Sequence, residues 1–263
     1  MRRPIVPITA GAALSAAGAA LLLPDPARAL ALAGLSGAWL GLSTWGVVSL
    51  RSGLFGPART RGPGTRPEVA LTWDDGPDPA STPALLDLLR ARGAPGAFFC
   101  VGERARAHPE LVRRIAAEGH LVGNHSDHHG WGTNFLGTSA LLRELSAAQA
   151  TLAGLSGALP RHYRPPIGLM NHAVDPASRV VGLTVVGWSI RSLDTGRRPP
   201  EQVVARVVAR LHPGAVVLLH DGGQAPERVR AIAGGILDAL PARGLQAARL
   251  DAVLAGVELP RGV

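Results

Sequence analysis

The larger, C-terminal part of the chain alternates short apolar runs with amphipathic stretches. The runs have the length of buried strands, and the stretches repeat apolar residues at helical spacing. This alternation predicts an α/β fold, in which helices cover a mostly parallel sheet or a barrel. The predicted strands are 69–73, 96–101, 121–123, 161–164, 183–188, 215–219 and 245–249, and the predicted helices are 82–91, 104–118, 139–153, 201–211 and 227–240.

The N-terminal part has a different pattern, with two uncharged apolar segments at 5–23 and 29–50. Each is close to the roughly 20 residues that a helix needs to cross a bilayer. We therefore expect one or two N-terminal transmembrane helices. The alternative is a cleaved signal peptide followed by a buried helix, because the first segment follows Arg2 and Arg3 and is rich in Ala and Gly.

The charge distribution sets this N-terminal part apart as well. The 27 basic residues are all arginine and exceed the 19 acidic residues by eight, and most of this excess lies before Pro67. A nucleic-acid-binding domain would carry clustered arginines on its folded part, so we expect no nucleic-acid partner. Basic residues that flank apolar segments are typical of sequence next to a membrane. Two spans would place the globular domain in the cytoplasm by the positive-inside rule, whereas a single span allows the domain to lie outside.

Composition also predicts the domain boundaries. Residues 1–51 contain the membrane segments, residues 52–66 are rich in Gly, Pro and Arg and are expected to form a linker, and residues 67–263 are expected to form the globular domain. Cys100 is the only cysteine, so the chain can form no intramolecular disulfide and no cysteine-rich zinc site.

Two adjacent carboxylates, Asp74 and Asp75, end the first predicted strand. Two like charges side by side are unfavourable unless a cation lies near them. A metal bound by one carboxylate would remove this repulsion and leave the other free as a base. In barrels of this class, chemistry gathers at the carboxyl ends of the strands, where these residues are expected.

His125 and His129 follow the third predicted strand. They are four positions apart, so on a helical turn they would share a face and could bind one metal. Two histidines and a carboxylate suit Zn²⁺, Co²⁺ or another divalent transition metal. The alternative is that they are surface or capping histidines.

Three further positions carry candidate chemistry. Arg164 precedes two prolines that present it rigidly, either to orient a carboxylate or to form a surface ion pair. The backbone N–H of Ile167 follows these two prolines, which have none, and could point at an oxyanion. His220 ends the sixth strand and is either a general acid or a structural histidine.

These motifs, in this order, resemble the polysaccharide deacetylases, the NodB homology domain of carbohydrate esterase family 4. The resemblance extends over about residues 68–257. It rests on the segments TWDDGP at 72–77, HSxxH at 125–129, RPP at 164–166, WSIRSLD at 188–194 and LxH at 218–220.

The resemblance implies a distorted (β/α) barrel that binds a divalent metal through Asp75, His125 and His129. Zn²⁺ is the first expectation, with Co²⁺ or another ion as the alternative. Asp74 would be the general base that activates the attacking water.

The resemblance also implies roles for the other motifs. Arg164 would position Asp74, the N–H of Ile167 would help to hold the tetrahedral oxyanion, and His220 would protonate the leaving amine.

The chain departs from the family pattern at three positions. Ile167 stands where the family usually has Tyr or Phe, Arg191 where it usually has Asp, and Thr195 where it usually has Trp. The usual Asp supports the catalytic histidine, so the partner of His220 stays open between Asp194, Asp221 and none.

We therefore expect a hydrolase, anchored to the membrane in a bacterial cell envelope, that removes acetyl groups from an N-acetylated polysaccharide, peptidoglycan or oligosaccharide. The alternatives are an O-acetyl esterase, a deacylase or deformylase of a lipid-linked sugar, and an inactive sugar-binding module, which only Arg191 favours. Stacking against sugar rings would fall to Trp73, Trp131 or Trp188, since the chain has few other aromatic residues.

Overall fold

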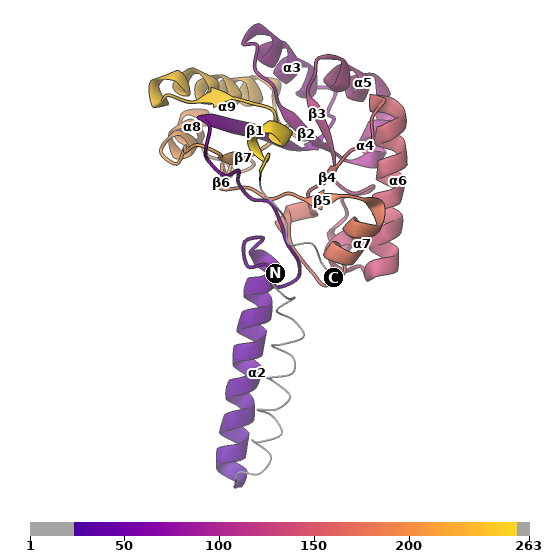
Figure 1. The fold of residues 1–263 in the computed structure, drawn as a ribbon, viewed down its shortest axis with the longest axis vertical. Coiled ribbons are helices and arrows are strands. Elements are labelled where there is room, and N and C mark those ends of the chain that lie inside the picture. The colour runs from indigo at the N-terminus through magenta and orange to yellow at the C-terminus, as the bar shows by residue number, and fades with distance from the viewer. Residues whose placement is uncertain (1–23, 257–263) are drawn as a thin grey trace.

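A curled parallel sheet forms the body of the molecule, with helices packed around it (Figure 1). The structure is a computed structural model and describes residues 24–256. All pairings between the named strands are parallel, which confirms the predicted α/β fold as a distorted half-barrel. In spatial order the strands are β5 (Thr184–Val185), β4 (His162–Tyr163), β3 (Leu121–Asn124), β2 (Ala97–Cys100), β1 (Glu68–Gly76), β7 (Val216–His220) and β6 (Ile190–Arg191), with β8 (Gln246–Ala247) paired to the start of β1.

The helices differ from the prediction in three places. The single helix expected over 104–118 is two helices that meet at His108, because Pro109 cannot donate the backbone hydrogen bond that a continuous helix needs. The helices α7 and α10 were not predicted. The elements between the strands are α3 (Thr82–Ala91), α4 (Gly102–Ala107), α5 (Pro109–Ala117), η1 (Trp131–Phe135), α6 (Thr138–Ser156), η2 (Pro166–Gly168), α7 (Val174–Val181), α8 (Pro200–Val208), α9 (Pro226–Ala239), η3 (Pro241–Arg243) and α10 (Leu250–Val253).

The central strand β1 alternates between two environments, as a strand buried on both faces must. Val69, Leu71 and Trp73 point outward into the apolar cluster formed with the surrounding helices. Ala70 faces the barrel interior, and the same alternation places Thr72 and Asp74 there. Asp74 is therefore the last interior residue of the strand.

The interior is closed at the amino ends of the strands. The side chains of α10, Leu250 and Val253, pack there with Leu254 against Ala70 and Val216. The opposite end, where the strands finish in polar residues, stays available for chemistry.

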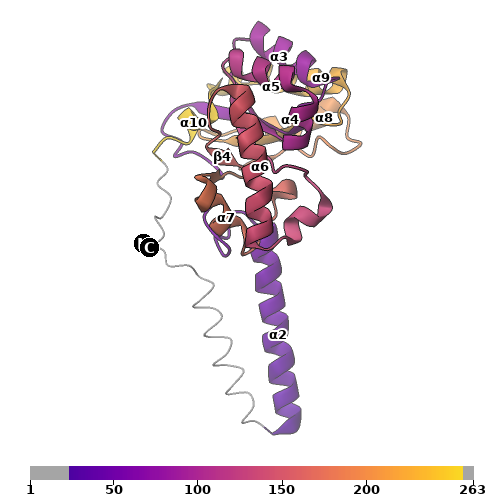
Figure 2. The same ribbon diagram turned by 90° about the vertical axis from the view of Figure 1, so that its right-hand side faces the viewer.

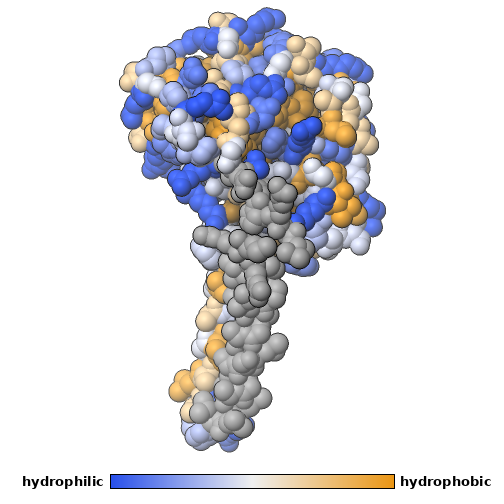
Figure 3. All heavy atoms as spheres, viewed as in Figure 1, coloured by the Kyte–Doolittle hydropathy of each residue, from blue (hydrophilic) through white to orange (hydrophobic). Residues whose placement is uncertain are grey.

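The helix α2 (Asp25–Val48) stands away from this body (Figure 2). Its 24 residues have a mean hydropathy of 1.3 in the most apolar stretch, and only 6% of that stretch is buried, so the helix is long and apolar enough to cross a membrane. A signal sequence would have the same properties. Pale and orange residues of low polarity line its visible side (Figure 3). The first expected span, 5–23, lies outside the described residues.

The segment 52–66, expected to be a linker, is packed against the barrel. Leu54 is buried, Arg59 forms a parallel bridge with Val186, and Arg61 forms an antiparallel bridge with Ala215. Its composition is that of a linker, but the edge of the short strand β5 has backbone groups that need hydrogen-bond partners. The segment provides one such partner, because the Arg59 N–H donates to the Val185 carbonyl over 2.9 Å.

Candidate active site

The two carboxylates occupy different positions at the end of β1. Asp74 faces the interior and is 4% exposed, whereas the Asp75 side chain is about one quarter exposed. Asp75 has a left-handed backbone conformation (φ 69°), and the register of β1 against β2 shifts between Asp74 and Gly76. Adjacent residues therefore present their carboxylates to different neighbours.

Asp75 meets the two predicted histidines. Its Oδ1 lies 3.3 Å from His125 Nε2 and 3.1 Å from His129 Nε2, and one donor atom from each of the three residues lies within 4.8 Å of the other two. Two imidazole nitrogens and a carboxylate oxygen fit a divalent transition metal. Asp75, His125 and His129 could therefore hold one ion.

The pKa shifts of Asp75 and His129 suit metal binding. Burial alone would raise the pKa of Asp75, but the hydrogen bond and charge of His125, together with His129, outweigh burial and hold that pKa well below its usual range. Burial and the neighbouring His125 lower the pKa of His129. Deprotonated carboxylate and neutral imidazole are the forms that bind metals.

The two histidines converge for a different reason from the one that their spacing indicated. Residues 125–129 form a loop and not a helical turn. Ser126 and His129 have left-handed backbones (φ 67° and 51°), and the loop is held by hydrogen bonds from Ser126 N–H to Asn124 Oδ1 and from His129 N–H to Ser126 Oγ. The His125 Nδ1 lies 2.7 Å from the Arg164 carbonyl. Donation to this carbonyl fixes the tautomer that leaves Nε2 free toward Asp75.

Arg164 is buried beside Asp74, which excludes the surface ion pair considered from the sequence. Its guanidinium has no solvent exposure and donates to Asp74 Oδ1 over 2.6 Å. It lies over the ring of Phe99, 4.1 Å from its centroid. The remaining hydrogen bonds run to Thr72 Oγ1 (2.8 Å), the Val186 carbonyl (3.3 Å) and the Gly187 carbonyl (3.0 Å). This set of acceptors fixes both the guanidinium and the Asp74 carboxylate.

Thr72 is part of this arrangement, although its motif gave no role for it. Its hydroxyl donates to the Val217 carbonyl over 2.7 Å and accepts from Arg164. The available signal was its position: Thr72 is a polar residue on the interior face of an apolar strand, two residues before Asp74.

His220 has Asp194 as its partner. The His220 Nδ1 lies 2.8 Å from Asp194 Oδ1, the His220 backbone N–H donates to Asp194 Oδ2 over 2.7 Å, and Ser192 Oγ donates to Asp194 Oδ1. Burial lowers the pKa of His220, but the hydrogen bond and charge of Asp194, with smaller contributions from Asp74 and Asp75, raise it overall to about 9. His220 is therefore protonated at neutral pH.

Arg191 and Asp221 do not support the His220 side chain. The Arg191 side chain is exposed, and Asp221 is buried with its Oδ2 on Thr82 Oγ1 at 2.5 Å. The departure at Arg191 thus leaves the histidine with a carboxylate partner. His220 and Asp74 are register partners on the adjacent strands β7 and β1, so they lie next to each other at the same end of the barrel.

The rim of the site contains Ile167 and Trp188. Ile167 is 46% exposed and left-handed (φ 60°), and its backbone N–H donates no hydrogen bond within residues 24–256. Trp188 covers Gly168 so closely that a Cβ there would lie 2.2 Å from its ring. A donor at this rim is free to meet a ligand.

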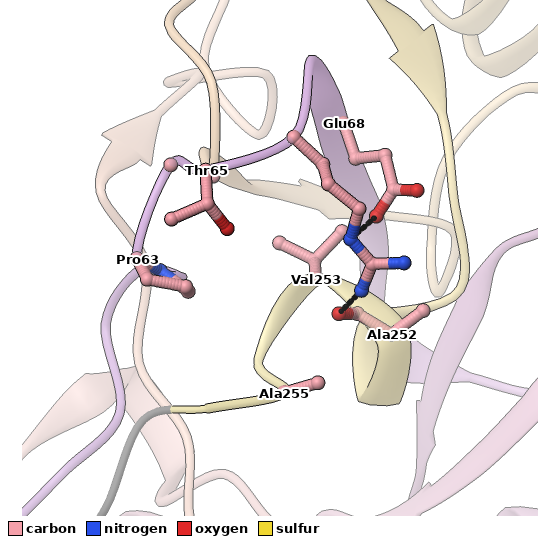
Figure 4. A pocket seen from close by; sticks show the side chains of 9 residues that line it. Pro63, Thr65, Glu68, Ala252, Val253 and Ala255 are labelled. Atoms are coloured by element: carbon pink, nitrogen blue, oxygen red, sulfur yellow. Dashed lines mark hydrogen bonds and ion pairs between the residues drawn. The ribbon is translucent and has the colours of Figure 1, made fainter.

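The other two candidate sugar platforms, Trp73 and Trp131, differ in their exposure. Trp73 is buried and stacks on Phe98, so it cannot be a sugar platform. Trp131 lies in η1 with 85% of its surface exposed. A small pocket elsewhere, where Arg66 links Glu68 to the Ala252 carbonyl, lies at the opposite end of β1 from Asp74 (Figure 4).

Comparison with known proteins agrees with this geometry. Residues 61–186 match the polysaccharide deacetylase family. The chain is 41% identical over 159 residues to a chitooligosaccharide deacetylase of Bradyrhizobium sp. (strain ANU 289), an alignment that covers 60% of this chain and 72% of that protein. The chain belongs to the polysaccharide deacetylase family.

Two further similarities extend this result. This polysaccharide deacetylase is 35% identical over 178 residues to a peptidoglycan-N-acetylglucosamine deacetylase of Bacillus cereus (strain ATCC 14579), covering 67% of this chain and 83% of that protein. Its fold matches the crystal structure of the Bc1960 peptidoglycan N-acetylglucosamine deacetylase with a TM-score of 0.71 and 28% identity, over 77% of this chain and 94% of the other. The protein is thus a hydrolase of carbohydrate esterase family 4.

Proposed function

We propose that this polysaccharide deacetylase removes N-acetyl groups from an amino sugar by metal-dependent hydrolysis. The observation that carries the proposal is the convergence of Asp75, His125 and His129 within 4.8 Å, with Asp74 and His220 next to them on adjacent strands. The relatives named for chitooligosaccharides and peptidoglycan support a substrate that contains N-acetylglucosamine.

Asp75, His125 and His129 would hold the ion, and their nitrogen and carboxylate donors favour Zn²⁺. A bound divalent ion would polarise the acetyl carbonyl and make a water molecule more acidic.

Asp74 is the proposed general base. Its carboxylate lies beside the donor set, with Oδ2 3.9 Å from His125 Nε2, and Arg164 holds its other oxygen. This hydrogen bond orients the carboxylate, which would accept a proton from the attacking water.

Two groups outside β1 would act on the oxyanion and on the leaving amine: Ile167 follows β4, and His220 ends β7. The N–H of Ile167 would donate to the former carbonyl oxygen as negative charge develops there. His220, protonated and oriented by Asp194, would give its proton to the amide nitrogen as the C–N bond breaks. The products are acetate and the free amine of the sugar.

We further propose that α2 anchors the enzyme to a membrane of the cell envelope, because its length and apolar composition allow it to span a bilayer. A topology reporter fused after Val263 would identify the face on which the catalytic domain lies.

Acetate release from N-acetylglucosamine oligomers tests the catalytic proposal. The enzyme should lose activity after treatment with a chelator and regain it with Zn²⁺ or Co²⁺, and D74N should retain about 1% of the activity or less. If acetate release is absent from all N-acetylated sugars tested, or is indifferent to metal, the proposal is wrong. Binding of sugar without turnover, unchanged in D74N, would identify an inactive binding module.

A further inference from the structure

The end of α2 is built into the catalytic domain. The Met170 N–H donates to the Val47 carbonyl over 2.9 Å, which joins the last turn of α2 to the loop after η2. Leu50, two residues beyond the helix, is 7% exposed and packs in the cluster that contains Tyr163 and Val185. No flexible tether separates the helix from the barrel.

This junction lies next to the active site. Ile167 is three residues from Met170, and three residues span about 10 Å at most. Leu50 also lies against Gly187, where an added Cβ would be 2.7 Å from its Cδ1. The Gly187 carbonyl is one of the acceptors of the Arg164 guanidinium.

Exposed aromatic side chains flank the same junction. Trp131 and Phe135 in η1 are each 85% exposed. The side chain of Asn171, the residue after Met170, donates to the Asn134 carbonyl over 2.8 Å and so fixes η1 beside the end of α2. Trp45, in the last turn of α2, is 52% exposed. Tryptophan at the boundary of an apolar span is typical of a membrane interface.

We propose that the face formed by η1 and the end of α2 lies against a lipid bilayer, so that the active site opens at the membrane surface and acts on N-acetylated sugars carried by lipids. The proposal rests on the membrane anchoring and deacetylation proposed above. A bilayer is the occupant that the structure favours, because the aromatic residues continue the apolar surface of α2 and the junction leaves no length of chain to lift the domain away.

The depth of η1 can be measured directly. Full-length W131C, labelled with an environment-sensitive fluorophore and reconstituted in phosphatidylcholine–phosphatidylglycerol vesicles, should be quenched at least twofold by spin-labelled lipid. Cys100 is fully buried and should not be labelled. The matched control is L159C: Leu159 is 70% exposed but follows the far end of α6, whose 19 residues span about 28 Å, and its probe should not be quenched. A W131C probe that lipid does not quench, whether it is open to water or covered by protein, overturns the proposal.

Substrate preference gives a second test. Wild-type enzyme in vesicles should have a higher kcat/KM for an N-acetylglucosaminyl lipid embedded in the same vesicles than for soluble N-acetylglucosamine oligomers. The ratio of the two values should fall at least fivefold in W131S/F135S and stay unchanged in L159S. Turnover of the soluble sugar alone would contradict the membrane-surface inference and leave the deacetylase proposal standing, whereas no turnover of either would contradict both.

Discussion

Arg164 donates a 2.6 Å hydrogen bond to Asp74 from a position without solvent exposure. The same residue accepts from His125 through its backbone carbonyl, so one arginine orients both the proposed base and a proposed metal ligand. A planar cation whose several donors reach different acceptors is needed here, and lysine offers only a single ammonium group.

The variant R164K tests this role. Lysine keeps the charge but cannot reach Thr72, Asp74 and two backbone carbonyls at once, so the carboxylate should lose its fixed orientation. We expect kcat to fall about 10²-fold or more. The control R179K alters an exposed ion pair with Asp175 and should leave kcat unchanged. A near-normal kcat in R164K would show that positive charge alone is sufficient.

Substitutions of Asp74 and Asp75 should have different effects, because the two carboxylates have different proposed functions. D75N removes one of three donors and should weaken metal affinity at least tenfold and abolish turnover. D74N removes the base and should lower kcat by about 10²–10⁴-fold while metal affinity stays close to that of the wild type. Calorimetric titration with Zn²⁺ and acetate release measure the two quantities. An equal loss of metal affinity in both variants would mean that Asp74 also binds the ion.

The pH profile should report the pair of His220 and Asp194. Because Asp194 raises the pKa of His220 to about 9, the protonated form persists at neutral pH and is lost as the pH rises through that value. If protonated His220 is the general acid, activity should therefore decline near pH 9. The D194N variant lacks the charge that raises the pKa of His220, whereas the burial that lowers this pKa remains. The alkaline limb of the kcat/KM profile should therefore move to lower pH by about two pH units or more. If the alkaline limb stays at the same pH in D194N, a group other than His220 is responsible for it.

The same pair links stability to pH. Because the pKa of His220 is higher in the folded chain than in the unfolded chain, its contribution is complete below about pH 6.5 and is lost as the pH rises through about 9. Wild-type and D194N thermal midpoints should therefore converge as the pH is raised over this window.

Leu50 should connect helix α2 to catalysis. L50A opens a cavity beside Gly187, whose carbonyl fixes Arg164, so it should reduce kcat as well as stability. L240A creates a similar cavity in the cluster behind the sheet, away from the site. Each should reduce the free energy of unfolding by about 2–5 kcal/mol. Only L50A should reduce kcat when both are assayed below their unfolding transitions, and equal kcat values would refute the connection.

The sequence predicted the part of the site that strand geometry determines. Asp74, Asp75 and His220 were expected at the carboxyl ends of strands, and parallel pairing brings the ends of β1 and β7 together. Periodicity identifies strands and their ends, so residues attached to those ends could be placed.

The parts that periodicity could not predict depend on loops. The histidines proposed to bind the metal converge through left-handed backbones at Ser126 and His129, which no helical spacing describes. The partner of His220 was open because Asp194 reaches it from a loop after the short strand β6. Helix α7 lies in a stretch with a proline inside it, and the packing of 52–66 depends on backbone groups that composition does not report.

Five residues other than glycine adopt left-handed backbones in the described chain: Asp75, Ser126, His129, Ile167 and Leu193. Asp75 lies in the irregular end of β1, and the other four lie in the segments that follow β3, β4 and β6. A left-handed conformation costs a non-glycine residue about 1–2 kcal/mol, a substantial fraction of the roughly 5–15 kcal/mol by which a folded domain is stable. Efforts to raise the heat resistance of this enzyme should therefore change its outer helices, since glycine at Asp75 or His129 would relieve strain and remove a proposed metal ligand.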